Sequence, residues 1–342
     1  MYINKNIKVK FLLQTSGMHL VWIVSWISSV YFLYYYFNFK YIAIPWTTVG
    51  VIGTAVSFYI GFKNNQAYDR LWEARKIWGG FTNTSRMLAT SLRAFSMPWN
   101  SENTIAQGEI QNNIKTILNR HIAYLYTLRH QLLIPTPWEH ISQKSRVGTV
   151  NRTRMNKYGI GSLEDNLTEN IIINHLNETE QNNLHTYKNV ATYLIDCQSQ
   201  HLSKLRLENI IDDFRHIELQ KLLNDLLDSQ GRVERIKNFP LPRQYGNASF
   251  IFVSIFIFLL PFGLVAEFSN ISNYLFIPVV SLIAWVFLIM ELVGDYSENP
   301  FEGLGNDIPM LSICRNIEID LKQLINDTNI PKPIQAVDGV LM

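Results

Sequence analysis

The residue types that most often carry chemistry are few and scattered in this chain. Its eight histidines are dispersed, and no HExxH, GxSxG, Walker or dinucleotide-binding pattern occurs. The two cysteines, Cys197 and Cys314, lie far apart without CxxC or His-flanked spacing. We expect two buried thiols there, rather than zinc ligands or a disulfide. The sequence therefore predicts no enzyme, no metal site and no cofactor.

One carboxylate stands out because of its surroundings. Glu291 lies inside a long apolar stretch, where an acid can relay protons in a transporter. Like His19, it is near an end of its stretch, from which a side chain can reach water or lipid headgroups. We interpret Glu291 as an interfacial residue, with proton transport as the functional alternative.

The elements around these residues are membrane spans. A helix needs about 20 mostly apolar residues to cross a bilayer, and four stretches qualify: 18–37, 42–62, 248–266 and 274–293. Short connections join them into two hairpins, and basic residues such as Lys63, Arg75 and Arg243 gather at the opposite ends. By the positive-inside rule, both termini and the long middle segment lie in the cytosol. We expect a multi-pass protein of the plasma (inner) membrane.

The polar remainder has the apolar spacing of amphipathic helices. Its 30 basic and 28 acidic residues are intermixed, which argues against nucleic-acid binding. We expect a loop at about 134–163, a second helical block at about 178–232, a turn at 297–309, a final helix at about 310–326 and a weakly ordered tail of a dozen residues. The predicted organisation is a cytosolic N-terminal segment (1–17), a first transmembrane hairpin (18–62), a cytosolic helical region (63–247), a second hairpin (248–293) and a cytosolic turn, helix and tail (294–342).

Three segments carry a resemblance to a known family. They read GFKNNQAYDRLWEAR at 61–75, LPFGLV at 260–265, and NPF at 299–301 leading to NDIP at 306–309. In this order around four spans, they resemble the bestrophin family of ion channels, including its prokaryotic branch. The resemblance covers most of the chain, with 135–186 the least matched part.

The resemblance implies an all-α, bestrophin-like fold that assembles as a homopentamer around one central pore, lined in the membrane by the second span. It places a narrow neck at Thr54, Phe58 and Phe62, and the spacing of four residues puts them on one helix face. Thr54 is polar, whereas members of the family usually have an apolar residue at this position. Without the resemblance, helix packing or lipid contact would be the better interpretation of Phe58 and Phe62.

The resemblance also implies a second, cytosolic constriction at an apolar residue beside a proline. Alignment favours Leu241 and leaves Phe239 open. Animal members bind calcium after the NPF turn through a run of aspartates, whereas this chain has only Glu302 and Asp307 there, which argues against calcium activation. Arg70 and Glu73 are interpreted as an ion pair at the cytosolic interface.

The function that follows is passive conduction of monovalent ions through a hydrophobic neck, with the pentamer itself and membrane lipid as partners. The family contains chloride channels, and some bacterial relatives favour cations, so the sequence leaves the sign of the ion open. The alternatives are a secondary ion transporter and a membrane scaffold that conducts nothing.

Overall fold

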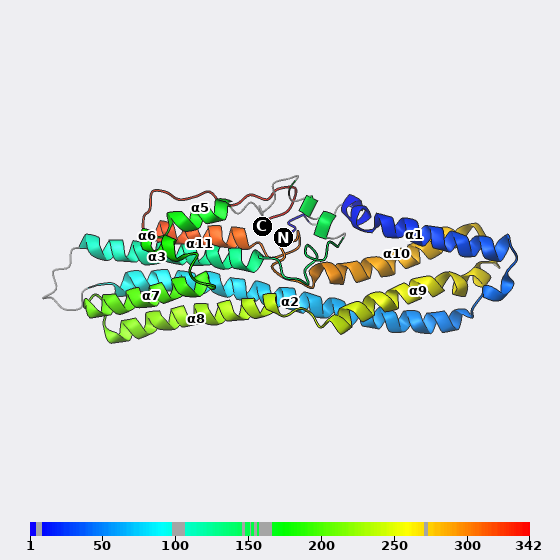
Figure 1. Ribbon diagram of the computed structural model, residues 1–342, viewed down its shortest axis with the longest axis horizontal. Helices are drawn as coiled ribbons and strands as arrows, with labels where there is room; N and C mark the ends of the chain where they lie inside the picture. Colours follow the sequence, from blue (N-terminus) through cyan, green and yellow to red (C-terminus); the bar gives the residue numbers. More distant parts are fainter. Residues whose placement is uncertain are drawn as a thin grey trace.

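One helix of 50 residues, α2 (Trp46–Phe95), runs through both halves of the molecule (Figure 1). Its apolar stretch ends near Phe62, yet the helix continues because residues such as Ala74, Trp78 and Phe81 still recur at helical spacing and are buried. The predicted boundary between hairpin and cytosolic region therefore falls inside a continuous helix. Any movement of α2 is shared by the two halves.

The computed structural model describes residues 1–4, 9–97, 107–145, 148–150, 152–153, 156, 166–269 and 273–342. Within these residues every regular element is a helix, apart from isolated β-bridges. The all-α class predicted from the sequence is confirmed.

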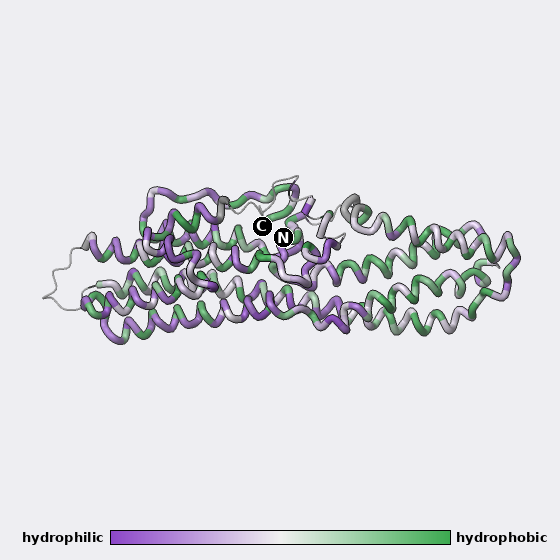
Figure 2. Tube along the Cα trace, in the orientation of Figure 1, coloured by the Kyte–Doolittle hydropathy of each residue, from purple (hydrophilic) through white to green (hydrophobic). Residues whose placement is uncertain are grey.

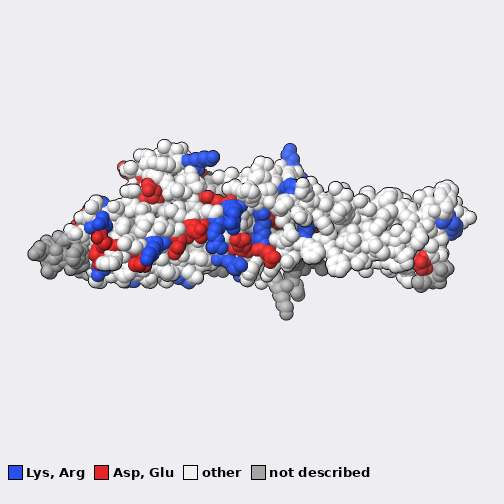
Figure 3. All heavy atoms as spheres, turned by 90° about the horizontal axis from the view of Figure 1, so that it is seen from below, with Lys and Arg blue, Asp and Glu red and all other residues white. Residues whose placement is uncertain are grey.

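The apolar half contains α2, α1 (Val9–Tyr35), the short 3-10 helix η1 (Lys40–Ile42), α9 (Arg243–Ser269) and α10 (Asn273–Ser297). Four helices in the described residues are long and apolar enough to cross a membrane, as predicted. Figure 2 shows this half as almost continuously hydrophobic, and Figure 3 shows few charges on it except at its tip. The second connection, at 267–273, includes residues 270–272, which lie outside the described residues.

The back of α2 packs closely against α9 at two glycines. A Cβ at Gly53 would lie 2.6 Å from the Phe256 ring, and a Cβ at Gly263 would lie 2.8 Å from Val49. Membrane helices associate through such close packing, because lipid offers no hydrophobic driving force between them. The two contacts fix which side of α2 faces the bundle.

The polar half is a second helical bundle around the other end of α2. It is formed by α3 (Gln107–Leu133), α5 (Asn166–Asn174), α6 (Glu178–Asn183), α7 (Val190–Leu207), α8 (Asp213–Asn238) and α11 (Met310–Leu324). Its core includes Trp78, Phe81 and Tyr124. The predicted helical block at 178–232 is divided into three helices, each begun by a side-chain cap from Asn177, Asn189 or Asp212.

The loop predicted at 134–163 is described only in part, because residues 146–147, 151, 154–155 and 157–163 lie outside the described residues. Its described segment 134–145 consists of turns and bends, as expected, whereas the described residues 148–150, 152–153 and 156 are helical, so the prediction of a loop is wrong there. The cysteines are both free. Cys314 is buried as predicted, whereas Cys197 is half-buried.

The C-terminal tail is better ordered than predicted. Val340 and Met342 are buried, Tyr2 and Val340 form an antiparallel bridge, and the Ser312 amide donates to the Met342 carbonyl. The partner of the tail is the distant N-terminus, which the tail sequence itself does not indicate. Both ends of the chain therefore meet near the middle of the molecule (Figure 1).

Candidate functional site

The predicted neck residues lie on the one face of α2 that the rest of the chain leaves open. Phe58 is 67% exposed and Phe62 is 68% exposed, and Thr54 is exposed one turn earlier. The opposite face, with Val56 and Ile60, is buried against α9 and α10. Packing within the chain is thereby excluded for both phenylalanines.

The polar groups on this face are partly satisfied by the helix itself. The Thr54 hydroxyl donates to the Gly50 carbonyl at 2.9 Å, and the Ser57 hydroxyl donates to the Gly53 carbonyl at 2.8 Å. Such back-bonding leaves the methyl group of Thr54 and the two phenylalanine rings as the larger apolar surfaces of the face.

A buried ion pair lies directly behind Phe62. The Lys63 ammonium contacts the Glu291 carboxylate, and their side chains are 2% and 3% exposed. The second oxygen of Glu291 accepts a hydrogen bond from Ser249 of α9. The interpretation of Glu291 as an interfacial residue open to water is therefore wrong, because Lys63 supplies its partner inside the protein. The pair joins α2 to α10 at the level of Phe62.

About two turns further into the polar half, Arg70 does not pair with Glu73 as predicted. Its guanidinium donates to the backbone carbonyls of Ile236 and Phe239, at the end of α8. A cation at this position suits the partial negative charge of a helix C-terminus. Glu73 instead lies 3.3 Å from Arg235. Arg70 thus ties α2 to the segment that carries the second predicted constriction.

The two candidates for that constriction lie in different surroundings. The Phe239 side chain is 72% exposed, whereas Leu241 is 8% exposed. Both line a pocket of about 470 Å³ between α2 and the connection from α8 to α9, together with Gln66, Asp69, Arg70, Glu73, Arg235 and Ile236. Only Phe239 presents its side chain outward.

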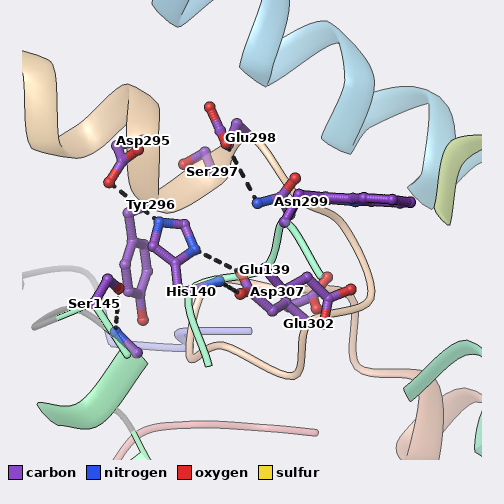
Figure 4. A network of polar contacts seen from close by, with 12 residues as sticks. Glu139, His140, Ser145, Asp295, Tyr296, Ser297, Glu298, Asn299, Glu302 and Asp307 are labelled. Carbon is purple, nitrogen blue, oxygen red and sulfur yellow. Dashed lines mark hydrogen bonds and ion pairs between the residues drawn. The ribbon is translucent and has the colours of Figure 1, made fainter. Parts of the chain in front are cut away.

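Buried ion pairs connect the apolar half to the polar half where the two meet, which we call the junction (Figure 4). His140 Nδ1 is 2.8 Å from Glu302, and its Nε2 is 3.1 Å from Asp295 at the end of α10. Burial would lower the pKa of His140, but the hydrogen bonds and charges of the two carboxylates raise it to about 10. The imidazole is therefore a permanent cation at neutral pH.

A second set of contacts surrounds the NPF turn. Buried Lys237 pairs with Glu139 and donates to the Phe301 carbonyl at 3.3 Å. Arg243 lies 3.3 Å from Glu298 and donates to the Trp138 carbonyl at 2.8 Å. These pairs join the 134–145 loop, the start of α9 and the turn after α10.

Asp307 holds the turn itself. Its carboxylate accepts backbone hydrogen bonds from Phe301, Gly303 and Ile308. Burial raises the pKa of Asp307, and the three N–H groups oppose that shift. The described residues contain no group of three or more His, Cys, Asp or Glu side chains placed to hold a metal ion.

A family model described as Bacterial/Fungal Bestrophin protein matches residues 15–323. This chain belongs to the bacterial and fungal bestrophin family. The match begins in α1 and ends in the last turn of α11, so it includes the exposed face of α2 and the charged junction.

Two relatives of this bestrophin are named voltage-dependent anion channel-forming proteins. YneE of Escherichia coli K12 is 25% identical over 323 residues, which cover 91% of each chain. RSc3414 of Ralstonia nicotianae is 26% identical over 285 residues, which cover 83% of this chain and 78% of the relative.

A crystal structure of a bacterial bestrophin homolog from Klebsiella pneumoniae has the same fold. Its TM-score to this bestrophin is 0.73 at 20% identity, and the match covers 94% of this chain and 100% of that one. The bestrophin-like arrangement of helices is confirmed.

Sequence reasoning missed several residues of the junction. Lys63 looked like one of many cytosolic basic residues, and His140 and Lys237 had no motif around them. The carboxylate partner of Lys63 is 228 residues away in the chain, and that of Lys237 is 98 residues away. The two partners of His140 are 155 and 162 residues away. The one available signal was the acid Glu291 inside an apolar stretch, which calls for a buried cation.

Proposed function

We propose that this bestrophin assembles as a homopentamer and passively conducts monovalent ions through a central pore lined by α2. The observation that carries the proposal is the exposed face of α2, on which Phe58 and Phe62 are two-thirds exposed and one helical turn apart. The names of its relatives give anions as the first class of ion to test.

The composition of that face favours a pore over lipid contact. The exposed positions of α2 in the apolar half include four hydroxyl side chains, Thr47, Thr48, Thr54 and Ser57. In contrast, the exposed large residues of α9 and α10 are phenylalanine, isoleucine, leucine and valine, with Tyr245 and Tyr274, near the starts of the two helices, as the exceptions. Hydroxyl groups can contact water in a pore, whereas aliphatic and aromatic faces suit lipid.

The neck in this proposal is formed by Thr54, Phe58 and Phe62. A ring of phenylalanines can close a pore by dewetting, and ions pass when the ring widens or hydrates. The positive edges of the rings can help an anion through, while an apolar ring can also pass a hydrated cation. The neck alone therefore does not fix the sign of the ion.

For the second constriction we propose Phe239 ahead of Leu241. The exposed ring of Phe239 can reach the pore, while Leu241 is buried against its own chain. The hydrogen bond from Arg70 to the Phe239 carbonyl couples this ring to α2. A movement of α2 would thus change both the neck and the second constriction.

The proposed orientation puts residues 1–17, 63–247 and 294–342 in the cytosol and the protein in the plasma (inner) membrane. We also propose that no calcium or other cofactor is needed. In support, the Asp307 carboxylate already accepts three backbone hydrogen bonds, and the Glu302 carboxylate is bonded to His140. Neither has the free oxygens that calcium requires.

The proposal is tested on purified protein in planar bilayers under a KCl gradient. A channel gives a steady reversal potential whose sign reports anion or cation preference. Saturable, coupled flux in vesicles would instead indicate a transporter, and silence from folded assemblies would indicate a scaffold.

The neck is tested with Phe58→Ala and Phe62→Ala together, which should raise the conductance or leave the pore open. Phe32→Ala is the matched control, since Phe32 is a 55% exposed phenylalanine on α1, across the bundle from α2. If the Phe58→Ala, Phe62→Ala variant has the same currents as wild type, neither phenylalanine lines the pore.

A further inference from the structure

The exposed face of α2 that carries the neck continues to an acid. Asp69 follows Phe62 by seven residues, which is about two helical turns, so both residues lie on one side of the helix. Asp69 is exposed, and it is the first ionisable side chain of this face after the neck. The rise of about 1.5 Å per residue places it about 10 Å beyond Phe62 along the axis.

The other charges nearest to the neck have partners within the protomer, although Arg70 and Glu73 line the same pocket as Asp69. Lys63 is buried against Glu291 behind the helix. The Arg70 guanidinium is directed to the carbonyl groups at the end of α8. Glu73 contacts Arg235. Lys63 and Glu73 are thus compensated by an opposite charge within the protomer, and Arg70 is partly compensated by the carbonyl dipoles at the end of α8.

Asp69 has no such compensation. In the part of the chain that the structure describes, its carboxylate accepts one long hydrogen bond, 3.4 Å from the amide of Asn65, and forms no ion pair. The next exposed charge in line along the face is Lys76, seven residues further on. Screening acts over about 8 Å at physiological ionic strength, so Lys76, about 10 Å further along the axis, contributes little to the potential at Asp69.

The location of Asp69 also suits contact with passing ions. It lines the pocket of about 470 Å³ that Phe239 lines as well. In the proposed pore, Asp69 therefore lies between the phenylalanines of the neck and the exposed ring of Phe239. An ion that leaves one apolar constriction toward the other has to pass this carboxylate.

We propose that Asp69 sets the charge preference of the pore: its carboxylates form a ring at the cytosolic mouth of the neck that concentrates cations and holds back anions. The inference rests on the proposed channel function and on α2 lining the pore. Rings of aspartate or glutamate select cations in channels by the same electrostatic attraction. The ring opposes the anion preference expressed in the names of the relatives, and it would weaken or reverse that preference in this chain.

The test measures the reversal potential of Asp69→Asn in planar bilayers under a KCl gradient. Removing the carboxylates should shift the reversal potential toward the chloride equilibrium potential, with a severalfold rise in the chloride-to-potassium permeability ratio. Asp69→Glu should keep the wild-type value. The difference between wild type and Asp69→Asn should shrink in 1 M KCl, where screening acts over about 3 Å.

Glu178→Gln is the matched control, because it removes an exposed carboxylate from α6, on the side of the bundle away from α2. It should leave the reversal potential unchanged. Asp69→Ser provides a second neutral variant if the asparagine variant does not assemble. Conducting neutral variants with the wild-type reversal potential would overturn the inference.

The Phe58→Ala, Phe62→Ala variant separates this failure from failure of the proposed function. If it alters conductance while neutral Asp69 variants leave selectivity unchanged, α2 lines the pore and only the acidic ring is wrong. If neither changes the currents, the pore lies elsewhere and both proposals fail.

Discussion

The exposed face of α2 and the junction between the two halves differ in how their side chains are held. Phe58, Phe62 and Asp69 extend from the protomer with few or no partners. Lys63, His140 and Lys237 are buried and bound to carboxylates. Changes on the exposed face should therefore alter currents at little cost in stability. Changes at the junction should alter stability first.

The largest effect is expected from breaking the buried ion pair behind Phe62. Glu291→Gln leaves the Lys63 ammonium buried without its counter-charge, and loss of one partner of a buried pair typically costs about 3–5 kcal/mol. Replacing both residues together, as Lys63→Met with Glu291→Leu, should recover most of that loss. Thermal unfolding of the detergent-solubilised protein measures both variants.

Glu218→Gln is the control for this comparison, since its partner Lys221 is an exposed surface residue. It should leave the unfolding temperature unchanged. Equal destabilisation by Glu218→Gln and Glu291→Gln would remove the distinction between buried and exposed charges.

The histidine at the junction makes a pH-dependent contribution. The folded-state pKa of His140, at about 10, lies above the ordinary 6.5, so the protonated form is stabilised in the folded protein. The contribution of His140 to the free energy of unfolding is fully present below pH 6.5 and is lost as the pH rises through about 10. The unfolding temperatures of wild type and His140→Gln should differ most below pH 6.5 and converge above pH 10. A constant difference across this range would show that His140 does not titrate there.

The smallest effects sharpen the choice between the two candidates for the second constriction. Phe239→Ala should change the conductance modestly and leave the unfolding temperature near wild type, because the ring is exposed. Leu241→Ala should do the reverse, with a loss of about 2 kcal/mol or more from the cavity. If Leu241→Ala changes the conductance while the unfolding temperature stays at the wild-type value, Leu241 forms the second constriction, as the alignment favours.

The same contrast explains how much could be predicted from the sequence. The four spans were predictable because hydrocarbon thickness imposes a length and a composition on each helix. Phe58 and Phe62 were found through the family resemblance, and their helical spacing agrees with the exposed face. A repeating face is a local property of the sequence.

The junction could not be predicted because its contacts join distant segments. Nothing near Lys63 indicates Glu291, and nothing near Arg70 indicates the carbonyl groups at the end of α8. The same holds for the tail, whose order comes from the N-terminus. Local composition specifies which side chains need a partner, but not which segment supplies it.

The central claim is that the exposed face of α2 lines the pore. It is tested most directly by Phe62→Cys treated with a charged, water-soluble thiol reagent during recording in planar bilayers. The reagent should reduce or abolish the current through Phe62→Cys, while wild type and Phe32→Cys keep theirs. A current through Phe62→Cys that stays unchanged after complete modification, confirmed by mass spectrometry, would contradict the account.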